Sequence, residues 1–245
     1  MKDKVFKAVD EYVLYVKRCP VQAFQSREPI YKFCLHPQIY KYFLELLHSK
    51  ESQLIKEMIE CFAISLVEEE ESNTEEYPQM LSTFCEQVSR VILESPIWND
   101  FREGLKLEEP LIKDASERRD SLTECVQKYL HQKIYSKVFN VSKSCVEKDT
   151  LLFERITSLS FIQPNHLDIQ EKSLDLKSLS AAQEELFSIN QKKSPIEKLL
   201  TILLSCKCIY SSLQSAGNLG ADTFFPLLIY VIIQANPPFL YSNLE

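Results

Sequence analysis

One stretch of the sequence indicates the fold class more strongly than any other: Leu219-Gly-Ala-Asp-Thr-Phe-Phe-Pro-Leu-Leu-Ile-Tyr-Val-Ile-Ile-Gln-Ala-Asn-Pro-Pro238. Every residue from Phe224 to Ile233 is hydrophobic except Pro226. Because a helix that crosses a bilayer needs about 20 apolar residues, this shorter run predicts a helix buried in a protein core. A single acidic residue, Asp222, stands at its start and is the first candidate for a functional side chain.

The composition agrees with a helical protein. The chain has 245 residues, which is enough for one or two hydrophobic cores. Its 45% hydrophobic and 26% charged residues are ordinary for a folded domain. Only three glycines occur, whereas folds rich in tight turns or phosphate-binding loops use many. The formal net charge of −7 argues against nucleic acid or an anionic membrane as the main partner.

The eight cysteines and four histidines do not form a recognisable site. The N-terminus, Met1-Lys-Asp-Lys-Val-Phe-Lys7, lacks the apolar segment of a secretory signal peptide. We therefore expect a cytoplasmic protein whose reduced thiols pack as small hydrophobic groups. Cys206 and Cys208 are the only close pair, and on a helix they point in different directions. No spacing resembles a zinc site, so we expect neither a metal nor a cofactor.

Hydrophobic residues recur at helical spacing along the chain, and strand-like alternation is absent. In the first part, this pattern predicts helices over residues 5–18, 37–47, 54–66 and 78–92, with the acidic run 67–77 as a solvated loop. The residues expected to face the core of the last three of these helices are Ile39, Tyr40, Phe43, Leu44, Leu47, Leu54, Ile55, Met58, Ile59, Phe62, Leu66, Leu81, Phe84, Val88, Val91 and Ile92.

A charged segment around Pro110 predicts a boundary between a helical bundle of residues 1–110 and a second domain of residues 111–245. In the second part, possible capping boxes predict helix starts at Ser121, Ser180 and Ser194, because the serine and the third residue after it can satisfy each other's free amides. A further helix is expected from Lys148, and residues 163–179 are expected to be an irregular connection. We therefore predict an all-α protein with two bundles in series.

No motif of covalent enzyme chemistry is present. The sequence contains no nucleophile elbow, phosphate-binding loop, zinc-protease pair or dinucleotide fingerprint. Neither His36 nor His131 has sequence neighbours that single it out. We therefore do not expect a hydrolase, a transferase or an oxidoreductase, although carboxylates or histidines distant in sequence could still converge in a pocket.

Two interpretations of Asp222 remain open from the residues alone. Aspartate and threonine are both favoured at helix N-caps, so Asp222 or Thr223 could cap the apolar helix, a role worth about 1 kcal/mol. Alternatively, the carboxylate acts on a partner. Residue preferences favour the cap, and the two roles are compatible with each other.

The segment Gly220-Ala-Asp-Thr-Phe-Phe-Pro-Leu-Leu-Ile-Tyr-Val-Ile-Ile-Gln-Ala-Asn-Pro-Pro-Phe-Leu-Tyr-Ser-Asn-Leu244 resembles the central motif of the Vps-nine domain family. Three upstream segments agree in kind: His131-Gln-Lys-Ile-Tyr-Ser-Lys-Val-Phe139, Phe153-Glu-Arg-Ile-Thr-Ser-Leu159 and Ser194-Pro-Ile-Glu-Lys-Leu199. Family members are all-helical guanine-nucleotide exchange factors for the Rab-five subfamily of early-endosomal GTPases. The resemblance thus implies nucleotide exchange without covalent chemistry, by a cytoplasmic protein recruited indirectly to endosomal membranes.

The resemblance also implies roles for three residues. The aspartate that matches Asp222 is an acidic finger, which enters the nucleotide site of the GTPase and competes with phosphate and Mg²⁺. The proline that matches Pro226 helps to form the apolar surface that faces the switch regions of the GTPase, and Phe225 is expected to extend that surface. Residues 1–110 match no family that we can name from the sequence.

Two features depart from the family pattern. Thr223 stands where many members have a second acid. Family domains also continue for several dozen residues past Tyr241-Ser-Asn243, with helices that complete the GTPase-binding surface. We therefore expect the exchange domain to be incomplete at its C-terminus and exchange by a form ending at Glu245 to be weakened or lost. The alternative function is an inactive helical scaffold that binds GTPases or trafficking proteins without catalysing exchange.

Overall fold

The computed structural model describes residues 37–68, 77–99, 115–139, 142–169, 174–215 and 220–244. All regular elements in these ranges are helices, which confirms the all-α prediction. The helices before residue 140 form one compact unit, and those after it form most of a second. The helix expected over residues 5–18 lies outside the described residues, as does the expected boundary at Pro110.

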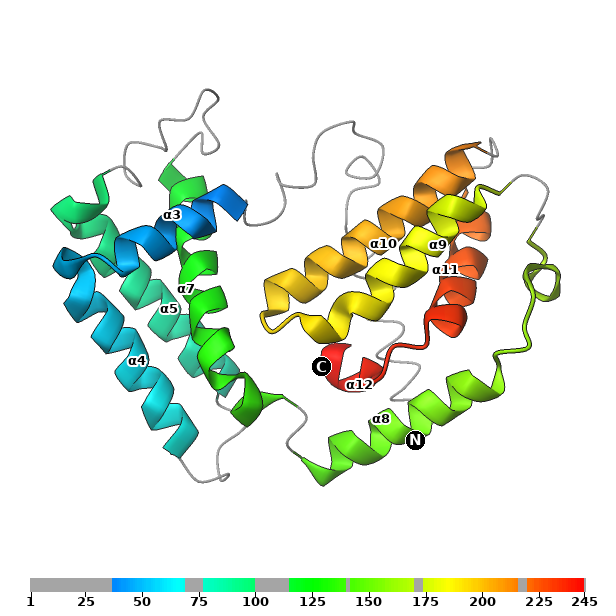
Figure 1. The fold of residues 1–245 in the computed structure, drawn as a ribbon, viewed down its shortest axis with the longest axis horizontal. Helices are drawn as coiled ribbons and strands as arrows, with labels where there is room; N and C mark the ends of the chain where they lie inside the picture. Colours follow the sequence, from blue (N-terminus) through cyan, green and yellow to red (C-terminus); the bar gives the residue numbers. More distant parts are fainter. Residues whose placement is uncertain are drawn as a thin grey trace. The chain divides into compact units, whose positions relative to one another are not determined.

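In its described residues, the first unit is a bundle of four helices: α3 (Pro37–Leu47), α4 (Gln53–Glu68), α5 (Tyr77–Glu94) and α7 (Ala115–Val138). Short 3₁₀ turns follow α3 at Lys50–Ser52 and α5 at Pro96–Trp98. Helix α7 packs against each of the other three, and α4, α5 and α7 run side by side (Figure 1). The side chains that fill this core most completely are Phe43, Leu47, Ile59, Ile92, Trp98, Leu122, Leu130 and Ile134.

The start of α7 differs from the prediction. The helix begins at Ala115, so Ser121 and Glu124 lie inside it and cannot form the predicted capping box. The segment Ala115-Ser-Glu-Arg-Arg-Asp120 consists mostly of residues that tolerate a helix well, and it extends the helix upstream. Because α7 completes the core of the first unit, the packing of the helices divides the chain between residues 139 and 140, downstream of the boundary expected near Pro110.

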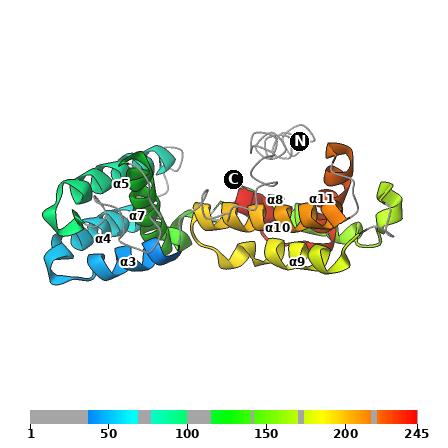
Figure 2. The same cartoon turned by 90° about the horizontal axis from the view of Figure 1, so that it is seen from above.

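The described part of the second unit contains five helices: α8 (Lys143–Ser158), α9 (Leu176–Phe187), α10 (Pro195–Ser215), α11 (Ala221–Ala235) and α12 (Leu240–Leu244). Short 3₁₀ turns lie at Pro164–Leu167 and Ser188–Gln191. Helices α9 and α10 lie side by side (Figures 1 and 2), and the Ser205 hydroxyl of α10 donates to the Ala182 carbonyl of α9 at 2.8 Å. Helix α11 packs against α9, and α12 packs against α8.

The core of the second unit is shared by α9, α10 and α11. Its buried residues are Leu179, Ala182, Leu186, Ile189, Ile202, Cys206, Ile209, Leu213, Leu227, Leu228 and Val231. The apolar run of α11 is therefore a buried helix, as its sequence predicts. None of the described helices is long and apolar enough to cross a membrane.

Two further helix starts were predicted too late in the sequence. Helix α8 begins at Lys143 and not at Lys148, because the side chain of Ser142 caps it by accepting the Cys145 N–H at 3.1 Å. Helix α9 begins at Leu176 and not after Ser180, because Asp175 caps it by accepting the Lys177 N–H at 3.0 Å. The predicted start of α10 after Ser194 is confirmed.

Some apolar side chains expected in the core are exposed. Leu54 is 80% exposed, and Met58 and Val91 are also exposed. On α4, burial follows the narrower stripe Ile55, Ile59, Ala63 and Leu66. Helical spacing identifies the buried side of this helix correctly, but it overestimates how far around the helix the core extends.

Candidate functional site

Asp222 lies in the first turn of α11, and its side chain is exposed. The N-cap residue is Gly220, with extended backbone angles of φ −97° and ψ 156°, and no side chain caps the helix end. The carboxylate of Asp222 makes no hydrogen bond or ion pair with another described residue. Capping by Asp222, the simpler interpretation of the sequence, is therefore wrong, and the carboxylate is free to act on a partner.

The two other predicted site residues, Phe225 and Pro226, lie one turn further along α11. Residues 222, 225, 226 and 229 recur at helical spacing and so share one face of α11, opposite the buried Val231. Phe225 and Pro226 are half-buried, and Ile229 is 48% exposed. The carboxylate thus stands at the end of an apolar surface made of Phe225, Pro226 and Ile229, which we call the α11 surface. Ile229 was not singled out from the sequence.

Pro226 changes the backbone of this turn as well as its surface. A proline has no backbone N–H, so the Asp222 carbonyl oxygen lacks the donor that residue 226 supplies in an ordinary α-helix. The rings of Phe224 and Phe225 meet edge to face, with their centroids 5.8 Å apart. Both rings pack partly against the core of the second unit, which anchors one side of the turn.

The C-terminal end of α11 is fixed by Asn236. This residue is in the left-handed conformation, with φ 35° and ψ 59°, and its N–H bonds to the Ile232 carbonyl at 2.9 Å. Its side-chain amide donates to the Thr157 hydroxyl at 2.9 Å, and the Gln234 amide donates to the Ile162 carbonyl at 3.2 Å. The helix thus ends directly before Asn236-Pro-Pro238, and these contacts connect α11 to α8 and to the segment that follows α8.

A second contact, between α8 and α12, has no signal in the sequence. Asp149 is only 4% exposed, and its carboxyl group accepts the Ser242 N–H at 3.1 Å and the Ser242 hydroxyl at 2.5 Å. Beside it, the Lys148 ammonium donates to the Tyr241 hydroxyl at 2.9 Å and lies 4.6 Å from the centre of that ring. The contact holds the segment that follows α11 in place.

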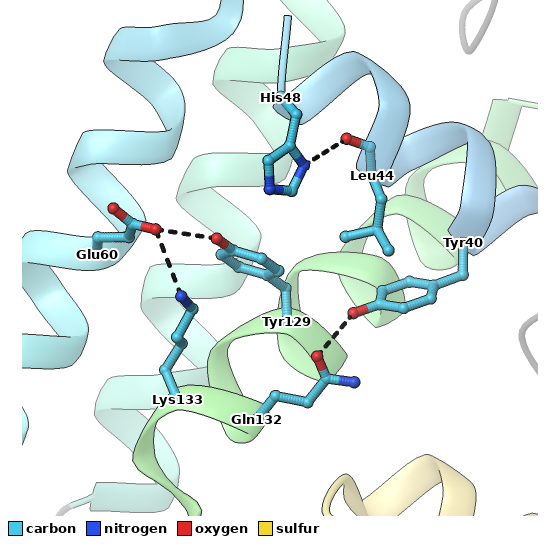
Figure 3. Close-up of polar contacts among 7 residues, drawn as sticks. All are labelled: Tyr40, Leu44, His48, Glu60, Tyr129, Gln132 and Lys133. Carbon is cyan, nitrogen blue, oxygen red and sulfur yellow. Dashed lines mark hydrogen bonds and ion pairs between the residues drawn. The ribbon is translucent and has the colours of Figure 1, made fainter.

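Titratable side chains also gather in the first unit, between α3, α4 and α7 (Figure 3). The Tyr129 hydroxyl donates to Glu60 at 3.0 Å, and the Lys133 ammonium lies 3.5 Å from the same oxygen. Burial and the bond to Glu60 raise the pKa of Tyr129 to about 12. Tyr40 donates to Gln132 at 3.3 Å in the same region. These contacts join neighbouring helices, and we interpret them as packing interactions rather than as a reactive centre.

Glu124 is the most perturbed carboxyl group on α7. Burial, with a smaller effect of the neighbouring Asp120, raises its pKa to about 7. No group of three or more histidine, cysteine or acidic side chains within the described ranges could hold a metal ion. Of the described thiols, Cys85, Cys125 and Cys206 are buried, as expected for core residues, whereas Cys61 is exposed.

Comparison with known proteins matches the C-terminal part of the second unit to a family. The model of the vacuolar sorting protein 9 (VPS9) domain matches residues 179–245, which include α9, α10, α11 and α12. Vacuolar protein sorting-associated protein 9A of Oryza sativa subsp. japonica is 40% identical over 142 residues, covering 55% of this chain and 30% of that protein. Its namesake in Arabidopsis thaliana is 32% identical over 213 residues, covering 82% of this chain and 38% of that protein.

A human protein named Rab5 GDP/GTP exchange factor is 30% identical over 139 residues, covering 53% of this chain and 28% of that protein. The chain therefore spans well under half the length of each of these relatives. The family match contains Asp222 and the whole α11 surface. Residues 179–245 of the chain thus match the VPS9 domain family.

Proposed function

We propose that this protein is a guanine-nucleotide exchange factor that promotes the release of GDP from small GTPases of the Rab-five subfamily. The observation that carries the proposal is the exposed carboxylate of Asp222, which has no partner among the described residues and stands beside the α11 surface. The similarity to a Rab5 GDP/GTP exchange factor supports the same function.

The proposed mechanism is displacement by competing charge. A small GTPase holds GDP mainly through its phosphates, which are bound by backbone amides, a lysine and Mg²⁺. A carboxylate that enters this site competes with phosphate for the lysine and weakens the binding of Mg²⁺. Each charge-assisted contact withdrawn from the nucleotide is worth about 1.5–3 kcal/mol, so the loss of two contacts would speed release by about two to four powers of ten.

The α11 surface supplies the binding energy that brings Asp222 to this site. Phe225, Pro226 and Ile229 are partly exposed apolar side chains. Their burial by a partner removes apolar surface from water and therefore favours binding. They lie on the same face of the helix as the carboxylate, so docking of this face directs Asp222 toward the partner. The mechanism needs no cofactor and no covalent intermediate.

The cellular setting is part of the same proposal. Relatives named for vacuolar protein sorting and for exchange on Rab5 support a role in endosomal trafficking. We propose that the protein acts from the cytoplasm and reaches early endosomal membranes through recruitment by other proteins.

The test is the release of fluorescent GDP from a panel of Rab GTPases, measured over a range of chain concentrations that extends far enough to detect weak exchange. The proposal predicts acceleration of release from Rab-five-type members and no effect on distant Rab proteins. If the chain, folded by circular dichroism, accelerates release from none of them, the proposal is wrong. Binding to a GTPase without acceleration would instead support the helical scaffold.

A further inference from the structure

The first turn of α11 lacks two groups that commonly hold the start of a helix: a capping side chain and one backbone N–H donor. Its N-cap is Gly220, which has no side chain to accept the free amides of the turn. The missing N–H of Pro226 leaves the Asp222 carbonyl without its helical donor. The turn that carries the proposed acidic finger is therefore weakly held at both of its ends.

Thr223 provides a side-chain bond across this turn. Its hydroxyl donates to the Gly220 carbonyl oxygen at 2.8 Å, which is shorter than the backbone bonds from Thr223 N–H at 3.2 Å and Phe224 N–H at 3.1 Å to the same oxygen. Asp222 lies between the two residues that this bond joins. The hydroxyl bond therefore restrains the backbone from which the carboxylate projects, without occupying the carboxylate itself.

We propose that Thr223 is a positioning residue for Asp222. The inference rests on the proposed exchange function, and it assigns a role to the hydroxyl that differs from direct contact with nucleotide. Without the bond, the first turn opens more often, as helix ends do when their free groups lack partners. Asp222 then spends less time in the geometry that competes with phosphate, whereas the α11 surface still docks.

The variants that test this role each remove, keep or add one hydroxyl group in the first turn of α11. Thr223→Val keeps the β-branched shape and removes the hydroxyl, and Thr223→Ser keeps the hydroxyl. A side chain at Gly220 would meet no atom closer than 3.9 Å, and the backbone there is already suited to an N-cap. Gly220→Ser therefore adds a capping hydroxyl that can hold the turn in a different way.

Two measurements are made on these variants. The first is amide hydrogen exchange of residues 220–226 in the free protein. The second is GDP release, resolved into the maximal rate and the chain concentration at half-maximal rate. For Thr223→Val we expect faster amide exchange and a maximal rate lower by about three- to tenfold, the size of one net hydrogen bond. The half-maximal concentration should stay within about twofold, since a change of that size is only about 0.4 kcal/mol. Thr223→Ser should behave as the native chain, and Gly220→Ser combined with Thr223→Val should recover the rate.

Unchanged amide exchange in Thr223→Val would overturn the inference, as would a rise in half-maximal concentration with no loss of maximal rate. The inference would also be overturned if Thr223→Ser lowered the maximal rate and Gly220→Ser combined with Thr223→Val did not recover it. If the native chain does not accelerate GDP release from any of the GTPases, the proposed function fails and the role of Thr223 in exchange fails with it. The amide exchange data still report separately whether the hydroxyl orders the turn.

Discussion

The contact between Asp149 and Ser242 gives a sharp prediction about what holds the end of the VPS9 segment. Substitution of Asp149 by alanine removes two hydrogen bonds at once, at 3.1 Å and 2.5 Å, from a position that is 4% exposed. A net hydrogen bond to a carboxylate is worth about 1.5–3 kcal/mol when the carboxylate is charged. Because removal of a buried acid also relieves its desolvation, we expect Asp149→Ala to lower the free energy of unfolding by about 2–4 kcal/mol.

The assay is a double-mutant cycle measured by urea unfolding. Ser242→Ala removes only the hydroxyl bond and should cost about 1–2 kcal/mol. The coupling free energy between the two substitutions should be about 1–2 kcal/mol, because they share that bond. Glu147→Ala, which removes an exposed acid of the same helix, should change stability by less than about 0.5 kcal/mol. A coupling free energy near zero would refute the account of how α12 is held against α8.

Substitutions at three further residues test other parts of the structure. Burial raises the pKa of Glu124 to about 7, so the folded state favours the protonated carboxyl. The resulting contribution to the free energy of unfolding is fully present below the unfolded pKa and is lost as pH rises from about 4.5 to 7. In thermal melts at pH 8, Glu124→Gln should therefore be more stable than the native chain by about 1 kcal/mol, after allowance for solvent screening. At pH 4 it should not be more stable, and a difference that does not depend on pH would contradict this. Pro226→Ala supplies an N–H for the Asp222 carbonyl, so chemical unfolding should show no loss of stability while GDP release slows; a clear destabilisation would contradict the interpretation of that turn. Asn236→Ala should lower the free energy of unfolding by about 1–2 kcal/mol, because alanine disfavours the left-handed conformation. Asn236→Gly loses only the bond to Thr157 and should lower it by less in the same unfolding assay. Equal losses would contradict the role of the left-handed backbone at residue 236.

The helix class and the ends of α11 could be predicted because their causes are local. Proline at the start of α10 and Asn236-Pro-Pro238 at the end of α11 restrict the backbone wherever they occur. The predicted starts at Ser121 and Ser180 were wrong because a serine followed by a glutamate or glutamine is also compatible with the middle of a helix. Only the structure shows that α9 is capped earlier, by Asp175, and that α7 already begins at Ala115.

The candidate site divides in the same way. The family resemblance singled out Asp222, Phe225 and Pro226, and their helical spacing places them on one face of α11. The exposure of the Asp222 side chain agrees with that placement. The hydroxyl bond of Thr223 and the contact between Asp149 and Ser242 could not be predicted. The first depends on the rotamer of one side chain, and the second joins residues far apart in the sequence. Neither leaves a periodic or local pattern.

The role of the Asp222 carboxylate is best tested by comparing GDP release in the presence of the native chain with release in the presence of Asp222→Asn, which removes the charge and keeps the size of the side chain. The GTPase is the most responsive member of the Rab panel, and Glu154→Gln serves as the control, since Glu154 is an exposed acid of the same unit. We expect release to be at least tenfold slower with Asp222→Asn, equivalent to about 1.4 kcal/mol or more. Glu154→Gln should give native rates, and neither variant should change the melting temperature by much. Release by Asp222→Asn within twofold of the native rate would contradict the claim that this carboxylate displaces the nucleotide.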